Sequence, residues 1–266
     1  MLKHGLLALG TVLLVLAGLT AVGCSRAKAQ PLLDPAATYA KAESFMTARK
    51  YTKAISWLQK VNTAQNRELR AQVHLRLADA YFEQKSILDL AEAKGRYQSF
   101  LNAFPLSGQA SYAQYRFSQC LQRSLNKPER DQGPTFLAMG EFRKVQDLYP
   151  NSPWVDEANV EIAALEDLLS RDALLKARFY YQRKSFAAAD VRLRNILRDN
   201  PDWEGRDEVL YLLGMSLRIR GQVAAGDDVL ARLQSDFPES EYGRKARKVL
   251  NRSGPASEQP AAGASG

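Results

Sequence analysis

The sequence predicts an all-α protein, a solenoid of about five helix pairs that follows an N-terminal export signal. Two observations predict this fold class. From residue 35 to residue 252, alanine, leucine and aromatic residues recur at three- and four-residue steps, and no stretch alternates as a strand does. In addition, similar short sequence motifs end in a proline at the positions where an amphipathic helix would end. These prolines are Pro105, Pro150, Pro201 and Pro238.

The first 23 residues have the anatomy of a signal peptide. Lys3 precedes an apolar stretch from Leu6 to Val22, and small residues and a cysteine close the segment. This stretch is near the lower limit for crossing a bilayer, so we expect cleavage, with an uncleaved signal anchor as the alternative. The rest of the chain, with 45% hydrophobic and 25% charged residues, is too polar for a polytopic membrane protein.

The run from Leu19 to Cys24 resembles the lipobox of bacterial lipoproteins, although Ala21 stands where leucine is most common. The resemblance implies that Cys24 is acylated and becomes the new N-terminus. Two or more acyl chains make attachment effectively stable, so the body would be tethered to the membrane rather than inserted. Ser25, rather than aspartate, follows the cysteine, which by resemblance to lipoprotein sorting favours the outer membrane over retention at the inner membrane. The expected location is therefore the periplasmic face of the outer membrane. Residues 24–34 are then a linker.

The net positive charge indicates which classes of partner to expect. Without Lys3 the chain keeps 36 basic residues against 29 acidic ones. Outside the cytoplasm nucleic acid is not an expected partner, so acidic protein surfaces or anionic lipid headgroups are the better candidates.

Cys120 is the only other cysteine, so a lipidated Cys24 leaves no intramolecular disulfide. We expect Cys120 to pack as a small hydrophobe, with a reactive thiol as the alternative.

The helical region divides into five repeats and a closing helix. The repeats span about 35–66, 71–105, 110–150, 153–201 and 206–238, and the closing helix spans 240–252. In at least four of them small residues, aromatics and a closing proline keep the order of the tetratricopeptide pattern. Asn66 replaces the proline of the first repeat, and Gly226 replaces an alanine of the fifth. Small residues let paired helices approach closely, and each pair buries its apolar face on the next.

Helix ends support this division. Asp34-Pro35 and Ser152-Pro153 each place a capping side chain before a proline at the first helical position. A long helix is expected from Pro153 to about Arg183. The tail, residues 253–266, is rich in small residues and proline, and we predict that it is disordered because it has little apolar surface to bury.

An ordered set of phrases resembles the BamD-type lipoproteins of outer-membrane protein assembly. The phrases are Arg130-Asp131-Gln132, Tyr149-Pro150-Asn151-Ser152, Leu174 to Tyr181, and Ala187-Ala188-Ala189 leading to Arg192. The resemblance covers roughly residues 35 to 250. Arg171-Asp172 in the long helix, and the missing proline after the first repeat, depart from the family pattern.

The resemblance implies a non-enzymatic scaffold without a cofactor. It would bind the POTRA region of an Omp85-family, BamA-type barrel protein, together with other assembly lipoproteins, and receive unfolded outer-membrane proteins. Arg192 matches a family arginine on the docking side, where it could pair with a carboxylate. A general periplasmic tetratricopeptide adaptor, in cell division or pilus assembly, is the alternative function.

Tetratricopeptide geometry also predicts a substrate groove. Residues one position after the core positions of each first helix should face the concave surface. They are Tyr39, Glu43, Met46, Asp79 and Phe82. This apolar and acidic mixture would suit an extended peptide with aromatic side chains and a basic element. For each residue, simple packing or solvation is the alternative.

No catalytic or metal site is expected. The mature chain has one histidine, His74, without a second histidine, a cysteine pair or a nucleophile with its base. Glu157 and Glu161 stand one helical turn apart and could share a metal ion or a proton, but a solvated face is the expected role. Trp154 and Trp203 follow repeat-closing prolines and should pack at helix starts, with interface anchors as the alternative.

Overall fold

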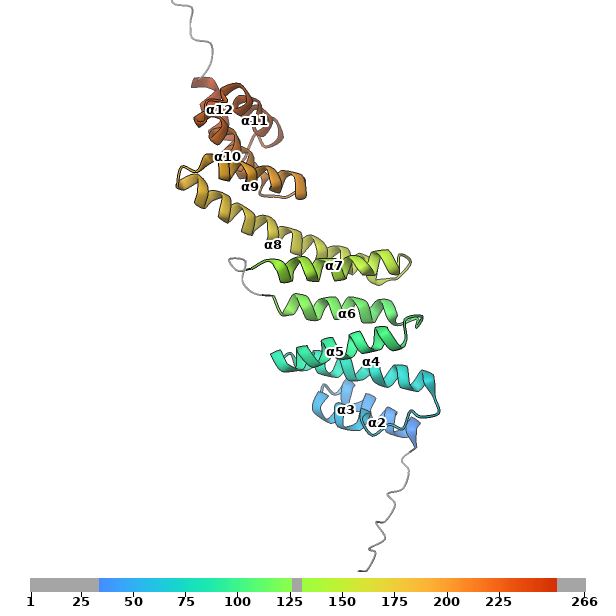
Figure 1. Ribbon diagram of the computed structural model, residues 1–266. Helices are drawn as coiled ribbons and strands as arrows, with labels where there is room; N and C mark the ends of the chain where they lie inside the picture. The colour runs from blue at the N-terminus through green and yellow to red at the C-terminus, as the bar shows by residue number, and fades with distance from the viewer. Residues whose placement is uncertain (1–33, 126–130, 253–266) are drawn as a thin grey trace, which may run out of the picture.

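The computed structural model describes residues 34–125 and 131–252, and every regular element in these ranges is an α-helix (Figure 1). The expected all-α solenoid of five helix pairs is confirmed. The helices are α2 (Pro35–Thr47), α3 (Tyr51–Leu58), α4 (Arg67–Gln84), α5 (Ile87–Ala103), α6 (Ala110–Arg123), α7 (Gly133–Leu148), α8 (Trp154–Gln182), α9 (Phe186–Asp199), α10 (Arg206–Ile219), α11 (Val223–Asp236) and α12 (Glu241–Arg252).

Several sequence predictions fall outside the described residues. These are the signal peptide at 1–23, lipid attachment at Cys24, the linker up to residue 33, Arg130 of the Arg-Asp phrase and the tail at 253–266. Within the described residues, no helix is both long enough and apolar enough to cross a membrane.

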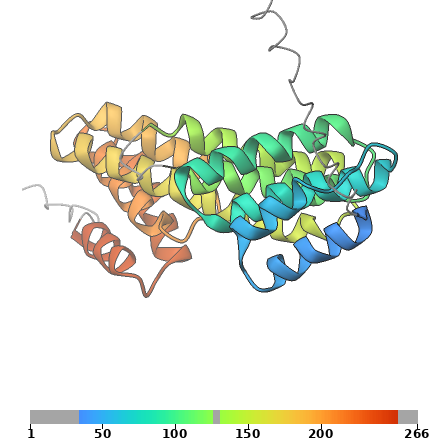
Figure 2. The ribbon, with the colours of Figure 1, turned by 90° about the horizontal axis from the view of Figure 1, so that it is seen from below.

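The helices stack in chain order into an elongated molecule. Each helix packs mainly on its neighbours in sequence, so α2 lies at one end and α12 at the other (Figure 1). Seen from below, the blue N-terminal helices and the red C-terminal helix again lie on opposite sides (Figure 2). Five clusters of buried side chains follow one another along the stack, which is the arrangement of a repeat protein whose units contact only their neighbours.

Small residues set the spacing between the helices. Alanines of the repeat pattern are completely buried in every one of the first four pairs, because a methyl group is all that fits where two backbones approach. They are Ala42, Ala54, Ala78, Ala93, Ala113, Ala138, Ala177 and Ala189.

The fifth pair has glycines at the crossing of α10 and α11. A Cβ atom added to Gly226 would lie 2.7 Å from the Gly214 carbonyl oxygen, and one added to Gly214 would lie 2.7 Å from Leu230 Cγ. The two helices are therefore closer here than a methyl group allows, which explains why Gly226 stands where the repeat pattern has alanine.

Helix starts follow the predicted chemistry with two corrections. The prediction that the second repeat begins at about residue 71 is wrong by four positions, because Asn66 caps α4 by accepting the Leu69 N–H at 2.9 Å and the helix begins at Arg67. The Asp34 carboxylate accepts the Ala37 N–H at 2.9 Å, and Pro35 begins α2. For the long helix, the prediction that Pro153 is the first helical residue is wrong by one position. Pro153 is the N-cap and α8 begins at Trp154, whose N–H donates to the Ser152 hydroxyl at 3.2 Å. Helix α8 runs 29 residues to Gln182, close to the expected end.

Candidate functional site

A groove of about 650 Å³ lies across the first three helix pairs and the start of α8. One face of α4 forms its long wall, because residues at helical steps from Glu68 to Asp79 line it. Side chains from the neighbouring helices complete the lining. Tyr39 comes from α2, Phe100 from α5, Tyr112 from α6 and Trp154 from α8.

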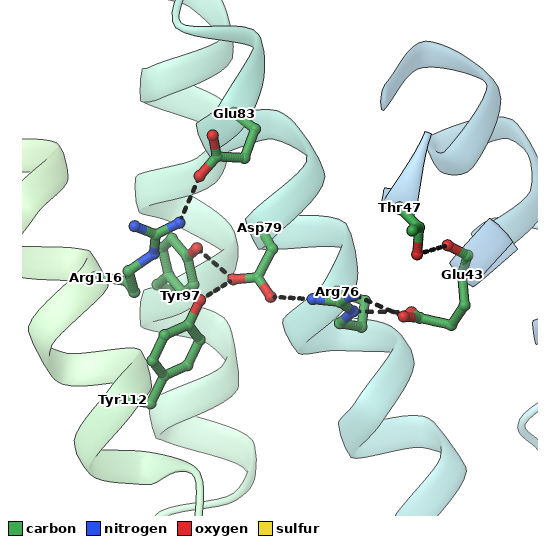
Figure 3. A network of polar contacts seen from close by, with 8 residues as sticks. All are labelled: Glu43, Thr47, Arg76, Asp79, Glu83, Tyr97, Tyr112 and Arg116. Carbon is green, nitrogen blue, oxygen red and sulfur yellow. Dashed lines mark hydrogen bonds and ion pairs between the residues drawn. The ribbon is translucent and has the colours of Figure 1, made fainter. Parts of the chain in front are cut away.

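Asp79 is the centre of a polar network at this groove (Figure 3). Its side chain is only 5% exposed. One carboxylate oxygen accepts the hydroxyls of Tyr97 at 2.7 Å and Tyr112 at 3.0 Å, and the other accepts Arg76 Nη1 at 3.2 Å. Burial together with this carboxylate raises the pKa of both tyrosines, so both hydroxyls stay protonated and act as donors.

Arg76 joins Asp79 to the first repeat. Its Nε and Nη2 donate to the two carboxylate oxygens of Glu43 at 2.8 and 2.6 Å, a bidentate pair. Burial and the adjacent Glu43 raise the pKa of Tyr39 to about 12. The Arg76 guanidinium therefore forms ion pairs with two carboxylates, those of Glu43 and Asp79.

The network repeats with the period of the solenoid. Three of its contacts join residues that are 33 positions apart, Glu43 with Arg76, Asp79 with Tyr112 and Glu83 with Arg116. Each contact therefore links equivalent faces of adjacent helix pairs. Polar contacts along the groove wall therefore connect α2 to α4 and α4 to α6.

Two residues predicted for the groove lie in the core instead. Phe82 is completely buried, because the guanidinium groups of Arg116 and Arg123 each cover its ring at 3.8 Å from the centroid. Met46 is 9% exposed and packs in the first core cluster. Helical spacing within one element does not report this burial, because the covering side chains come from neighbouring helices.

The other three predicted residues are at the groove. Tyr39 and Asp79 line it, and Glu43 is half-buried beside them in the pair with Arg76. Sequence reasoning missed Arg76 and Tyr112, which supply the remaining polar contacts. Helical spacing from Asp79 back to Arg76, and the 33-residue step from Asp79 forward to Tyr112, were the available signals.

The groove has an acidic and aromatic character. Two carboxylates, Glu68 and Asp79, and one cation, Arg76, line it, and Glu43 pairs with Arg76 next to the lining. Trp154 contributes a ring that stacks on Tyr115 at 5.2 Å between centroids. Such a surface can hold an extended segment by stacking and by charge-assisted hydrogen bonds to a basic side chain. In the described part of the chain no group of three histidine, cysteine or carboxylate side chains could hold a metal ion.

Arg192 lies far from this groove, on α9. Its guanidinium covers the Tyr180 ring at 4.1 Å and donates to the Ala188 carbonyl at 3.0 Å. Phe179, one residue before Tyr180, is 52% exposed. The Phe179 ring lies edge-on to Tyr180 at 5.5 Å between centroids, and Arg183 covers it at 5.3 Å. A cluster of aromatic and arginine side chains is common at protein interfaces.

The remaining single residues have ordinary packing roles. Cys120 is buried, and burial raises its thiol pKa to about 12, as expected of a small core hydrophobe. His74 contacts the Phe104 ring edge-on, and burial lowers its pKa. Trp203 is 8% exposed and donates its indole N–H to Asp167 at 2.7 Å. Glu161 accepts a hydrogen bond from Gln122 at 2.7 Å.

Comparisons with known proteins agree with the resemblance read from the sequence phrases. Three relatives named outer membrane protein assembly factor BamD align with the chain. The Haemophilus influenzae protein is 26% identical, over 67% of this chain and 76% of its own length. The Rickettsia prowazekii protein is 25% identical, over 89% and 94%. The Vibrio cholerae protein is 27% identical, over 71% and 83%.

A solved structure and a family model complete the comparison. The TPR2AB domain of yeast Sti1, solved as a pHSP90 complex, superposes with a TM-score of 0.44 at 11% identity, over 82% of this chain and 84% of that one. At this distance the superposition carries no argument. The family model described as outer membrane lipoprotein, YfiO, matches residues 32–229, which is most of the folded body. The chain therefore belongs to the YfiO family of outer membrane lipoproteins.

Proposed function

We propose that this protein is a non-enzymatic scaffold of outer-membrane protein assembly, held on the periplasmic face of the outer membrane through acylated Cys24. Its groove receives extended segments of unfolded outer-membrane proteins. Family membership and the assembly-factor names of the relatives support the general role. The groove itself is the observation that carries the proposal, because it combines aromatic rings, acidic groups and an open length across three repeats.

The lining favours a particular kind of segment. Tyr39, Tyr112 and Trp154 offer ring faces and edges to aromatic side chains of the ligand. Asp79 and Glu43 already share Arg76, so Glu68, which is exposed at the wall, is the carboxylate best able to take a new cation. We therefore expect preference for extended segments in which an aromatic residue stands near a lysine or arginine.

A matched pair of charge reversals tests the groove. Glu68 and Glu157 are both exposed, and both lie in the first turn of a helix. Each carboxylate interacts favourably with the positive end of its helix dipole, so Glu68→Lys and Glu157→Lys should destabilise the protein by similar amounts. Only Glu68 lines the groove. Anisotropy of a labelled aromatic and basic peptide from a β-barrel protein should show about tenfold weaker binding for Glu68→Lys, roughly 1.4 kcal/mol. Equal affinity of the two variants would contradict the groove assignment.

The docking side is a separate part of the proposal. Arg192 would pair with a carboxylate on the POTRA region of an Omp85-family barrel protein. Tyr180, which Arg192 covers, contacts the exposed Phe179, so an aromatic ring would be available to the same partner. Other assembly lipoproteins would join the same complex.

A pull-down from the native envelope in mild detergent tests docking. Arg192→Glu should reduce the recovered Omp85-family protein by tenfold or more, on the order of the loss when one partner of a buried charge pair is removed. Arg194→Glu is the matched control, because Arg194 is exposed on the same helix. Equal recovery with both variants would remove Arg192 from the interface. Recovery of division or pilus proteins in place of the barrel protein would assign the general adaptor role.

A further inference from the structure

We propose that the outer face of α2 and α3 is a docking surface for an anionic phospholipid bilayer. The surface consists of Phe45 and Trp57 with Lys41, Lys53 and Lys60 around them, and we name it the lysine-aromatic patch. It lies in the first helix pair, at the end of the solenoid where the chain enters from its N-terminal segment (Figure 1). It shares no residue with the groove lining or with the Arg192 region.

The patch is a compact arrangement of two rings and three ammonium groups. The Phe45 and Trp57 ring centroids are 6.4 Å apart. Lys41 Nζ and Lys53 Nζ lie 5.3 and 6.0 Å from the Phe45 centroid, and Lys60 Nζ lies 5.1 Å from the Trp57 centroid. The rings are half-buried and the three lysines are exposed. Among the described residues, none of these lysines forms an ion pair with a carboxylate.

Positive charge gathers at both ends of the helical body, and the first helix pair is one of them. Residues 35–60 hold five basic residues and one acidic residue, a net charge of +4, whereas residues 61–240 hold 24 basic and 25 acidic residues. Residues 241–252, at the other end, also hold five basic residues and one acidic residue. The single acid, Glu43, is occupied by the bidentate contact with Arg76 of α4. The positive charge of the first helix pair is therefore not neutralised by its own carboxylates.

A basic hollow adjoins the patch. Arg49, Lys50 and Lys53 line it with Tyr51, Thr52 and Gln84, and its volume is about 320 Å³. Lys53 belongs to both features, since it lines the hollow and also faces the Phe45 ring. All five basic residues of the pair thus belong to the patch or to the hollow beside it.

The chemistry fits a bilayer surface better than a folded acidic protein. Trp57 has an apolar ring with one polar edge, Phe45 adds an apolar ring, and the lysines have long apolar stems. Such side chains settle at the headgroup level of a membrane. Each lysine near an anionic surface contributes about 1 kcal/mol, without any need for a shaped pocket. A tight protein interface would need a recessed apolar anchor site, whereas the two rings here are half-buried and have exposed lysines around them. The family description, outer membrane lipoprotein, places such a bilayer within reach.

The distance from the predicted anchor is also short. Nine residues lie between Cys24 and Asp34, and the ten steps from one Cα atom to the next span at most about 36 Å. With Cys24 acylated, the first helix pair would be confined near the bilayer, which raises the effective concentration of headgroups at the patch.

Quenching of tryptophan fluorescence by brominated lipid tests the proposal with the full-length chain purified from its own membranes. The protein is reconstituted into vesicles of phosphatidylcholine alone or of phosphatidylcholine mixed with phosphatidylglycerol, each doped with brominated phosphatidylcholine. We expect stronger quenching in the anionic vesicles, lost at high salt because the attraction is screened. Trp57→Phe should remove this difference, since Trp203 is buried and Trp154 is packed against Tyr115. Equal quenching in both vesicles, or a difference that persists in Trp57→Phe, would overturn the proposal.

Two triple variants separate local contact from net charge. Lys41→Glu, Lys53→Glu and Lys60→Glu together should shift the docked equilibrium by more than about 100-fold, since each lost lysine accounts for about fivefold. The matched control reverses Arg244, Arg247 and Lys248 of α12, which are exposed at the other end of the solenoid. Loss of quenching in the control as well would show a net-charge effect and refute the patch. Quenching absent throughout, with a co-purifying acidic protein lost only in the lysine variant, would assign the patch to that protein instead.

Because peptide affinity and barrel-protein recovery are measured separately, failure of this proposal and failure of the proposed function are distinguishable.

Discussion

Replacing Asp79 by asparagine tests whether the polar network stabilises the groove. The substitution keeps the shape of the side chain and removes its charge. The amide oxygen can still accept the Tyr97 and Tyr112 hydroxyls, which now lie 2.7 and 3.0 Å from one carboxylate oxygen. The amide nitrogen would face Arg76, a donor facing a donor.

The expected cost follows from these contacts. A hydrogen bond to a charged group stabilises a protein by about 1.5–3 kcal/mol, and a neutral one by about 0.5–1.5 kcal/mol. Weakening two hydroxyl contacts therefore costs about 2 kcal/mol. Arg76 adds little to this cost, because its bidentate contact with Glu43 remains. For a body of this size, about 2 kcal/mol lowers the melting temperature by roughly 4–8 °C.

Asp172→Asn is the matched control for this measurement. Asp172 is as buried as Asp79, but its one ion-pair partner is Lys176, whose side chain is 51% exposed. Such a pair contributes about 0–1 kcal/mol. Thermal and urea unfolding followed by circular dichroism should therefore separate the two variants clearly. Asp79→Asn melting together with the wild type, or together with Asp172→Asn, would refute the assignment of stability to the network.

Three further predictions concern packing and pH. Ala189→Leu should overpack the contact of α8 with α9 and cost about 1–3 kcal/mol, whereas Ala187→Leu on the exposed face should cost less than about 0.5 kcal/mol; equal melting temperatures would contradict the repeat register. Gly226→Ala should lower the melting temperature because its Cβ meets backbone, while Gly140→Ala, which has open space in α7, should raise it; differential scanning calorimetry distinguishes the signs. The pKa of Tyr39 is raised from 10 in the unfolded chain to about 12 in the folded protein. The stabilisation that its protonated hydroxyl contributes should therefore be complete below pH 10 and fall as the pH rises towards 12. A Tyr39→Phe variant that loses as much stability across this window would exclude Tyr39 as the cause.

The network also bears on how the groove responds to a ligand. Its contacts join adjacent helix pairs at a step of 33 residues, so a change in the spacing of the pairs would break them together. We expect the groove to be largely preformed, with side-chain adjustment at Glu68 and Trp154 on its rim. A preformed groove reduces the ordering cost of binding an extended segment.

The sequence determined the fold because its signals are local. Helical spacing, capping pairs such as Asp34-Pro35 and completely buried small residues such as Ala189 depend on neighbours along the chain, and they located five helix pairs. Cys120 and Trp203 also behave as their residue types predict. The predicted starts at 153 and 240 lie one residue before α8 and α12, which is the usual uncertainty of helix ends. Helix α4 begins at Arg67, four residues before the predicted start of the second repeat, because Asn66 caps it.

Tertiary structure decided which side chains of a helix face remain accessible. The period of α4 placed Asp79 and Phe82 on one face, but Asp79 lines the groove and Phe82 is covered by Arg116 and Arg123. These arginines belong to α6, more than thirty positions along the chain, so no local pattern could report them. Tyr112 reaches the Asp79 carboxylate across the same distance. The periodic pattern of a helix predicts on which face a side chain lies, whereas the exposed fraction of that side chain depends on the residues that the neighbouring repeat packs against it.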